Sequence, residues 1–188
     1  NSGNLFSFVS YGSVTFRDLA IIHTDVTNIQ VNRGSWSNIC FNLDGTGGGR
    51  VFALHNVTTF GFDKVFSLVG SVNNDTNFCT ECTFIDGNTF MYCVNPNAVI
   101  NRYQGCTWGT EWNYVFNLSG FGHTTLQNCN IVVSGSILYL PEVGSNDSIQ
   151  NSRYVLDNCK IEFYAAYGAA SNATTKLIYA PSKNTAGS

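Results

Sequence analysis

Three carboxylate side chains recur along the chain at intervals that would suit acid and base chemistry. Asp63, Asp86 and Glu111 follow one another in three successive stretches of similar length. Two carboxyl groups about 5 to 10 Å apart serve retaining and inverting glycosidases, where one donates a proton and the other is nucleophile or base. The spacing predicts these residues as catalytic candidates. The alternative is that they are solvated loop residues, with Asp86-Gly87 an ordinary turn.

The densest cluster of aromatic and acidic residues lies beside the last of these carboxylates. It contains Trp108, Glu111, Trp112 and Tyr114. Flat aromatic rings stack against the C–H faces of sugars, and carboxylates bond to sugar hydroxyls. Trp108 falls at a position expected to face the core. Trp112 and Tyr114 are therefore the predicted substrate-binding residues.

Other chemistries find little support in the sequence. A lyase needs clustered basic groups to neutralise a uronate, and the basic candidates are scattered: Arg102, Arg153 and Lys160. The three histidines show neither triad nor metal-ligand spacing: His23, His55 and His123. Cys79-x-x-Cys82 has no second closely spaced Cys or His pair to complete a zinc site. No metal or cofactor is predicted.

A repeat of 23 to 25 residues, stretched by insertions at both ends, must position these candidates. Its motif is apolar-x-x-apolar-x-apolar, and a small polar residue often precedes the central apolar one, which allows a bend between two short strands. Those polar residues are Asp18, Asn56, Asn128 and Asn158. The central residues are predicted to stack in one interior column: Leu19, Val57, Cys82, Cys106, Cys129 and Cys159.

A further strand follows each motif, and its predicted inward residues are Cys40, Phe66, Met91, Val115, Leu138 and Ile178. The residues on either side of them are also mostly apolar. Since successive residues of a strand face opposite sides, this pattern predicts a strand buried on both faces. Its outer face would carry an apolar stripe that a partner covers, formed by Phe41, Tyr92, Phe116, Tyr139 and Tyr179.

Short strands in a repeat of this length bury their apolar faces only by stacking one repeat on the next. The predicted fold is all-β, a right-handed parallel β-helix (solenoid) of about six coils. Residues 1–180 are predicted to form one domain and 181–188 a polar C-terminal tail, in a fragment of a larger chain. The leucine-rich repeat, which has a similar period, is disfavoured because its Leu and Asn consensus is missing.

The composition narrows the classes of partner. The net charge is −3, and no cluster of Lys and Arg is available to neutralise phosphates or anionic lipids. No apolar run reaches the roughly 18 residues that span a bilayer. Nucleic acid and membrane insertion are therefore not predicted. The odd count of seven cysteines favours free thiols and synthesis in a reducing cytoplasm.

The opening Gly12-Ser13-Val14-Thr15-Phe16-Arg17-Asp18-Leu19-Ala20-Ile21 and the Asn-Cys-x-Ile turns resemble the pectate-lyase-like parallel β-helix superfamily. Within it, the low charge and the high Asn and Gly content most resemble bacteriophage tailspike and tail-fibre proteins. The resemblance implies a homotrimer in an extracellular virion tail that binds, and often cleaves, a bacterial surface polysaccharide such as capsule or lipopolysaccharide. The sequence leaves three classes open: a depolymerase, a non-catalytic glycan-binding module and a structural β-helix shaft.

Overall fold

The computed structural model describes residues 3–23, 37–44, 48–69, 74–94, 98–109, 113–118, 123–140, 153–163 and 176–179. These residues form strands and their connections, and no helix occurs among them, so none that could span a membrane. The strands are β1 (Asn4–Phe8), β2 (Tyr11–Ile22), β3 (Ile39–Leu43), β4 (Gly49–Leu68), β5 (Asn74–Thr80), β6 (Thr83–Cys93), β7 (Ala98–Gln104), β8 (Thr107–Gly109), β9 (Tyr114–Leu118), β10 (His123–Gln127), β11 (Asn130–Val133), β12 (Ser136–Tyr139), β13 (Arg153–Asp157), β14 (Lys160–Phe163) and β15 (Lys176–Tyr179).

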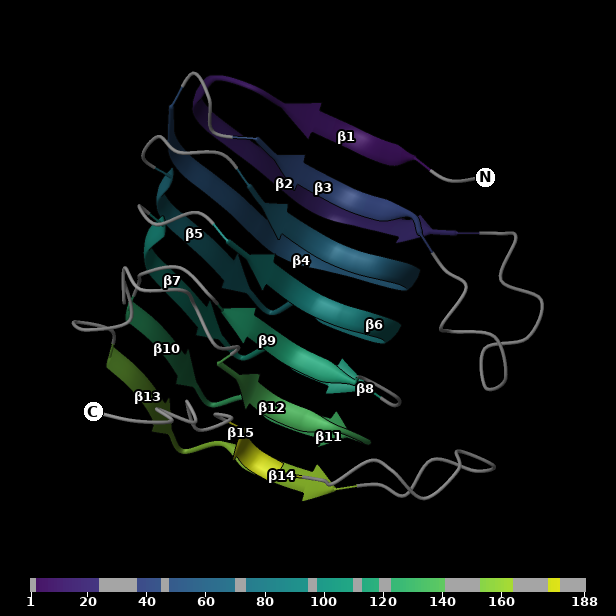
Figure 1. Ribbon diagram of the computed structural model, residues 1–188, viewed down its shortest axis with the longest axis vertical. Coiled ribbons are helices and arrows are strands. Elements are labelled where there is room, and N and C mark those ends of the chain that lie inside the picture. The colour runs from purple at the N-terminus through teal and green to yellow at the C-terminus, as the bar shows by residue number, and fades with distance from the viewer. Residues whose placement is uncertain are drawn as a thin grey trace, which may run out of the picture.

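The strands form one strongly curled sheet in which every described pairing is parallel (Figure 1). One path of neighbours runs β13-β10-β7-β5-β4-β6-β8-β11-β14. A second series runs β1-β3-β4-β6-β9-β12-β15, and it joins the first because β4 and β6 belong to both. The predicted all-β class and parallel pairing are confirmed.

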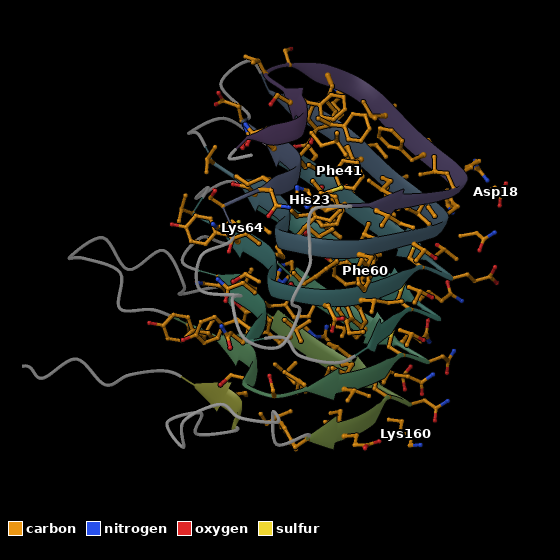
Figure 2. The ribbon with its side chains drawn as sticks, turned by 90° about the vertical axis from the view of Figure 1, so that its right-hand side faces the viewer. Asp18, His23, Phe41, Phe60, Lys64 and Lys160 are labelled. Carbon is orange, nitrogen blue, oxygen red and sulfur yellow. The ribbon has the colours of Figure 1, made fainter. Side chains whose placement is uncertain are left out.

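A bend at one position of each repeat gives the sheet part of its curl. The bend residue has a positive φ in the left-handed region: Asp18 (54°), Asn56 (51°), Glu81 (56°), Gly105 (63°), Asn128 (54°) and Asn158 (50°). Asn, Asp and Gly tolerate this region best, which explains most of the residue types found there. The side chains lie at one edge of the molecule, where Figure 2 labels Asp18. Asn56 Nδ2 donates to the Asp18 carboxylate (2.8 Å), and Asn158 Nδ2 donates to the side-chain oxygen Oδ1 of Asn128 (2.7 Å).

The residue after each bend forms the predicted interior column. Leu19 pairs directly with Val57, and the register on both sides of the bend aligns the four cysteines with them. Each thiol donates to the carbonyl oxygen two residues earlier: Cys82 to Thr80 (3.3 Å), Cys106 to Gln104 (3.5 Å), Cys129 to Gln127 (3.3 Å) and Cys159 to Asp157 (3.4 Å). Cysteine suits this column because it is small, apolar and a weak hydrogen-bond donor.

The core inside the curl is rich in aromatic rings. Its largest fully buried side chains include Trp108, Tyr103, Phe52, Phe84 and Phe90. Most neighbouring rings meet edge-on or tilted, as between Phe84 and Phe90, whose centroids lie 4.4 Å apart, and such contacts add to the stabilisation from burial of apolar area. Residues distant in sequence therefore share one continuous core.

The structure corrects the predicted register of the second series of strands. Its core column is Phe6, Phe41, Phe66, Met91, Phe116, Leu138 and Ile178. The prediction placed Cys40 and Val115 there, one residue too early. The physical reason is that two consecutive residues point into the core: Cys40 and Phe41 are both 0% exposed, as is Val115, and Phe116 is 2% exposed. Strict alternation of the strand faces does not hold at this position.

The predicted outer stripe is therefore wrong at two of its five positions. Phe41 and Phe116 lie in the core (Figure 2 labels Phe41), where Phe41 stacks on Phe66 with centroids 5.3 Å apart. Tyr92 and Tyr139 are partly exposed, as predicted. The side chain of Tyr179 lies outside the described residues.

Candidate functional site

The predicted catalytic and binding residues divide between buried, partly exposed and undescribed positions. Asp63 in β4 and Asp86 in β6 are 4% and 6% exposed. Tyr114 begins β9 and is partly exposed. Glu111 and Trp112 lie outside the described residues. Their assignment to catalysis and substrate binding stays a prediction.

Asp63 belongs to a ladder of side chains spaced 25 residues apart, which we call the amide ladder: Asn38, Asp63, Asn88 and Asn113. The backbone N–H of Asp63 donates to Asn38 Oδ1 (3.1 Å), and Asn38 Nδ2 donates to the carbonyl oxygen of Gly61 (3.2 Å). Asn88 Nδ2 donates to Asp63 Oδ1 (2.9 Å), and Asn113 Nδ2 donates to Asn88 Oδ1 (2.5 Å). The hydrogen bonds of the ladder link β4, β6 and the residue that precedes β9. Each ladder residue directly precedes a residue on the outer face of the sheet: Lys64, Thr89 and Tyr114.

The amide ladder ends at Gly135, for a steric reason. Gly135 is the next residue in register after Asn113, because Ser136 pairs with Tyr114. A Cβ at this position would collide with the backbone carbonyl of Asn113, which accepts a hydrogen bond from the Ser136 N–H (2.8 Å). Glycine is therefore required for this close approach.

The second oxygen of the Asp63 carboxylate is engaged by Lys64. Lys64 Nζ lies 2.6 Å from Asp63 Oδ2, and the side chain of Lys64 is 27% exposed. The same ammonium lies 5.5 Å from the centroid of the Tyr92 ring, a cation–π geometry. Both carboxylate oxygens of Asp63 thus have partners within the chain, an arrangement typical of a structural ion pair more than of an open general acid.

Asp86 occupies a second bend. Its φ is 47°, and its register neighbour on β4 is Gly61, with φ 82°. Asp is among the residues that tolerate this conformation best. Asp86 therefore forms a bend inside β6 and is buried, so it is not the solvated loop turn of the alternative interpretation.

Two columns of residues on β3, β4, β6, β9 and β12 face away from the core, and together they form what we call the tyrosine face. Its described side chains are Ile39, Lys64, Thr89, Tyr114 and Ser136 in one column, and Asn42, Ser67, Tyr92, Asn117 and Tyr139 in the other. Ser67, Thr89 and Ser136 are almost fully covered, at 3%, 4% and 3% exposed. The larger side chains beside them form the accessible surface.

The larger side chains of the tyrosine face meet in diagonal pairs. Tyr114 and Tyr139 stack with centroids 4.6 Å apart and planes inclined by 21°. Lys64 and Tyr92 form the other pair. In each pair the second residue lies three positions beyond the register partner of the first. The repeat therefore fixes the aromatic rings on one side of the sheet.

Such a face can bind a ligand that has flat apolar patches and many hydroxyls. The tyrosine rings offer stacking surfaces with a polar edge, and amide and hydroxyl side chains such as Asn42 and Asn117 offer donors and acceptors. Of these tyrosines, Tyr114 was predicted from the sequence as a substrate-binding candidate, whereas Tyr92 and Tyr139 were predicted to lie in a subunit contact. The 25-residue spacing of Asn38, Asp63, Asn88 and Asn113 was the available signal for the ladder beneath.

The seven cysteines of the chain are all free thiols, and all but Cys159 are buried. All seven cysteines are described, and none forms a disulfide. Burial raises the pKa of the Cys40 thiol. Burial is also the main reason why the pKa of Cys79 is raised, and its contact with Cys82 raises it further. Within the described ranges no group of three or more His, Cys, Asp or Glu side chains is placed to hold a metal ion.

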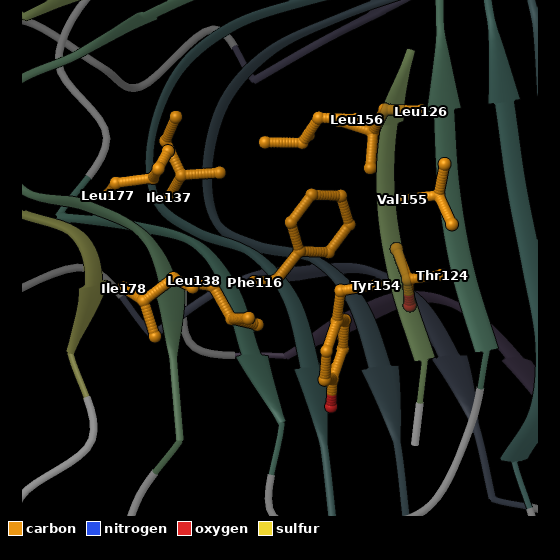
Figure 3. Close-up of a pocket in the computed structure, with 10 residues that line it drawn as sticks. All are labelled: Phe116, Thr124, Leu126, Ile137, Leu138, Tyr154, Val155, Leu156, Leu177 and Ile178. Atoms are coloured by element: carbon orange, nitrogen blue, oxygen red, sulfur yellow. The ribbon is translucent and has the colours of Figure 1, made fainter.

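A cavity of about 160 Å³ lies at the C-terminal end of the core, between β9, β12 and β15 on one side and β10 and β13 on the other (Figure 3). Its lining is almost entirely apolar: Phe116, Leu126, Ile137, Leu138, Val155, Leu156, Leu177 and Ile178, with Thr124 and Tyr154. Leu156, Leu177 and Ile178 are 42%, 43% and 55% exposed. Among the described residues that line the cavity there is no carboxylate, histidine, cysteine or lysine side chain.

Comparisons of the chain with protein-family models, with curated proteins and with solved structures found no match.

Proposed function

We propose that the chain is a segment of a tailspike-type receptor-binding protein and that its tyrosine face binds a bacterial surface polysaccharide. The observation that carries the proposal is the row of partly exposed tyrosines, Tyr92, Tyr114 and Tyr139, held on one rigid sheet face. Sites on a rigid scaffold bind without a large ordering cost. An extended glycan lying across the strands would meet successive rings.

The finer fold in this proposal is a right-handed parallel β-helix. It is supported by parallel pairing between residues 23 to 25 positions apart over the central strands, as in the register of β4, β6 and β9. Stacked repeats of this kind pair every strand edge except the terminal ones. β13 and β14 are the two terminal strands of the main sheet order.

Binding without hydrolysis fits the described residues best. The Asp63 carboxylate is buried and has both oxygens engaged, and Asp86 serves a bend. A glycosidase needs one carboxyl group free to donate a proton and another free to attack or to activate water. The structural shaft, which binds no glycan, is the competing function.

Retardation of the native protein in gels that contain capsule or lipopolysaccharide preparations tests the proposal. The wild type is expected to be retarded, and the double variant Tyr92→Ala with Tyr139→Ala is expected to migrate freely. Phe78→Ala is the matched control: Phe78 is also partly exposed beside a cation, Arg102 at 5.9 Å from its centroid, but it lies on β5, outside the tyrosine face. Free migration of the wild type as well as of the double variant would support the shaft, and equal retardation of both would place glycan binding outside the tyrosine face.

The proposal includes a homotrimer in an extracellular virion tail, synthesised in a reducing cytoplasm. Because two residues of the predicted stripe lie in the core, we place the subunit contact on the outer side of β2, β4 and β6 instead. There Ile22, Phe60 and Ile85 are in register and face outward, and Ile22 is 59% exposed (Figure 2 labels Phe60). An apolar column of this kind suits burial between copies of the chain under closed symmetry.

A further inference from the structure

The tyrosine face carries very little charge. Of its described side chains only Lys64 is ionic, and the others are aromatic, hydroxyl, amide or aliphatic. The ammonium of Lys64 is held between the Asp63 carboxylate (2.6 Å) and the Tyr92 ring (5.5 Å). Among the described side chains of the face, the one positive charge is therefore paired with a negative charge directly beside it.

The hydrogen bonds of the amide ladder do not by themselves require a carboxylate at position 63. The other three members, Asn38, Asn88 and Asn113, are asparagines, and Asp63 Oδ1 accepts from Asn88 as an asparagine oxygen would. An amide at position 63 would keep the ladder. The carboxylate differs from an amide by its negative charge, and this charge forms an ion pair with Lys64 Nζ.

We propose that the ligand of the tyrosine face is a neutral polysaccharide, and that Asp63 is a positioning residue that cancels the charge of Lys64 and holds its stem against Tyr92. The inference rests on the proposed glycan-binding function. An uncharged face with stacking rings has no long-range attraction for uronate, sialate or phosphate groups. It binds neutral sugars through ring stacking and hydrogen bonds, which salt screens little.

The test compares neutral and anionic polysaccharides, with mannan and dextran in one arm and polygalacturonate and hyaluronate in the other. Binding is measured at about 0.05 M and about 0.5 M salt. The wild type is expected to bind in the neutral arm with the same affinity at both salt concentrations, and to bind weakly in the anionic arm.

Asp63→Asn supplies a readout that a merely structural role would not change. The variant keeps the hydrogen-bonding pattern of the ladder and leaves the Lys64 ammonium unpaired. Its affinity for polygalacturonate at low salt is expected to rise about three- to fivefold, and the gain should vanish at high salt. In the double variant Asp63→Asn with Lys64→Gln the gain should disappear, because the ammonium that Asp63→Asn leaves unpaired is gone.

The outcomes separate the two proposals. Salt-sensitive binding of the wild type to the anionic arm alone would overturn the neutral ligand and leave glycan binding standing. No gain of anionic binding in a folded Asp63→Asn protein would overturn the role of Asp63. If the wild type binds neither arm, the proposed function fails and this inference fails with it.

Discussion

Tyr114 and Tyr139 lie 25 residues apart in sequence and stack with their ring centroids 4.6 Å apart. The contact is diagonal, because Tyr114 pairs in register with Ser136 and not with Tyr139. The same diagonal brings Lys64 over Tyr92. The outer surface of the sheet is therefore built by relationships between neighbouring repeats, and several consequences can be measured.

The corrected strand register predicts that two aromatic residues in neighbouring strands contribute very different amounts to the free energy of unfolding. Phe116→Ala should lower the free energy of unfolding by about 3 to 5 kcal/mol, since Phe116 is 2% exposed and contacts Phe90, Tyr103 and Trp108. Tyr139→Ala should cost less than about 1.5 kcal/mol, because its ring lies on the outer face. Urea denaturation measures both. Equal costs would contradict the register.

The bend column predicts a sharp difference between two substitutions at one position. Asn128 has φ 54°, and the neighbouring repeat has glycine in register, Gly105 with φ 63°. Asn128→Gly should change the free energy of unfolding by only a few tenths of a kcal/mol, whereas Asn128→Val should lower it by about 1 to 2 kcal/mol. A Val variant as stable as the Gly variant, in the same thermal melts, would show that this bend is not under steric control.

Buried thiols and phenols predict loss of stability in alkali. Burial raises the pKa of Cys40 and Cys79 above 9.0 and that of Tyr103 above 10.0, the values expected in the unfolded chain. Above pH 9 the unfolded state therefore releases protons that the folded state retains, so the free energy of unfolding falls as pH rises, by up to about 1.4 kcal/mol per pH unit for each group. Below pH 9 these groups contribute no slope.

Denaturation with urea at a series of pH values from neutral to alkaline checks this prediction. Cys40→Ala should reduce the alkaline slope, because it removes one of the groups. Under denaturing conditions a thiol titration should count all seven cysteines. A flat profile through pH 9 to 11 would contradict the burial of these groups.

The trimer proposal predicts a change of mass on charging the outer apolar column. The wild type should scatter light as three copies of the 20.5 kDa chain. Phe60→Glu with Ile85→Glu should release monomers or cause aggregation, since charges would be buried without partners. Thr125→Glu, also in a partly exposed position but on β10, is the control. A wild type that is a monodisperse monomer would remove the trimer.

The sequence predicted the repeating strands and the bend between them, and it missed the position where the faces of a strand do not alternate. The column through Leu19 and Cys159 was found because one residue class recurs at one spacing, and parallel stacking places such residues in register. Phe41 and Phe116 were misplaced because the strand was assumed to alternate, while two consecutive residues turn inward. A one-residue error exchanges the faces of a strand, so the aromatic stripe was assigned partly to the wrong side.

The candidate site was predictable only in part for a different reason. Asp63 and Tyr114 were identified by residue type, but the diagonal pairs join residues of adjacent repeats at an offset of three positions. Such contacts depend on the register of both strands. The engagement of Asp63 by Asn88 and Lys64 depends in the same way on the third dimension.

The most direct test of the central claim is a map of backbone amide chemical shifts during titration with an oligosaccharide prepared from a polysaccharide that retards the protein. The account predicts that the largest shifts fall at Tyr92, Tyr114 and Tyr139 and their neighbours on β6, β9 and β12, and that Phe78 and Arg102 on β5 and β7 do not respond. Shifts centred on β5, β7 and β10, or none at saturating ligand, would contradict binding at the tyrosine face.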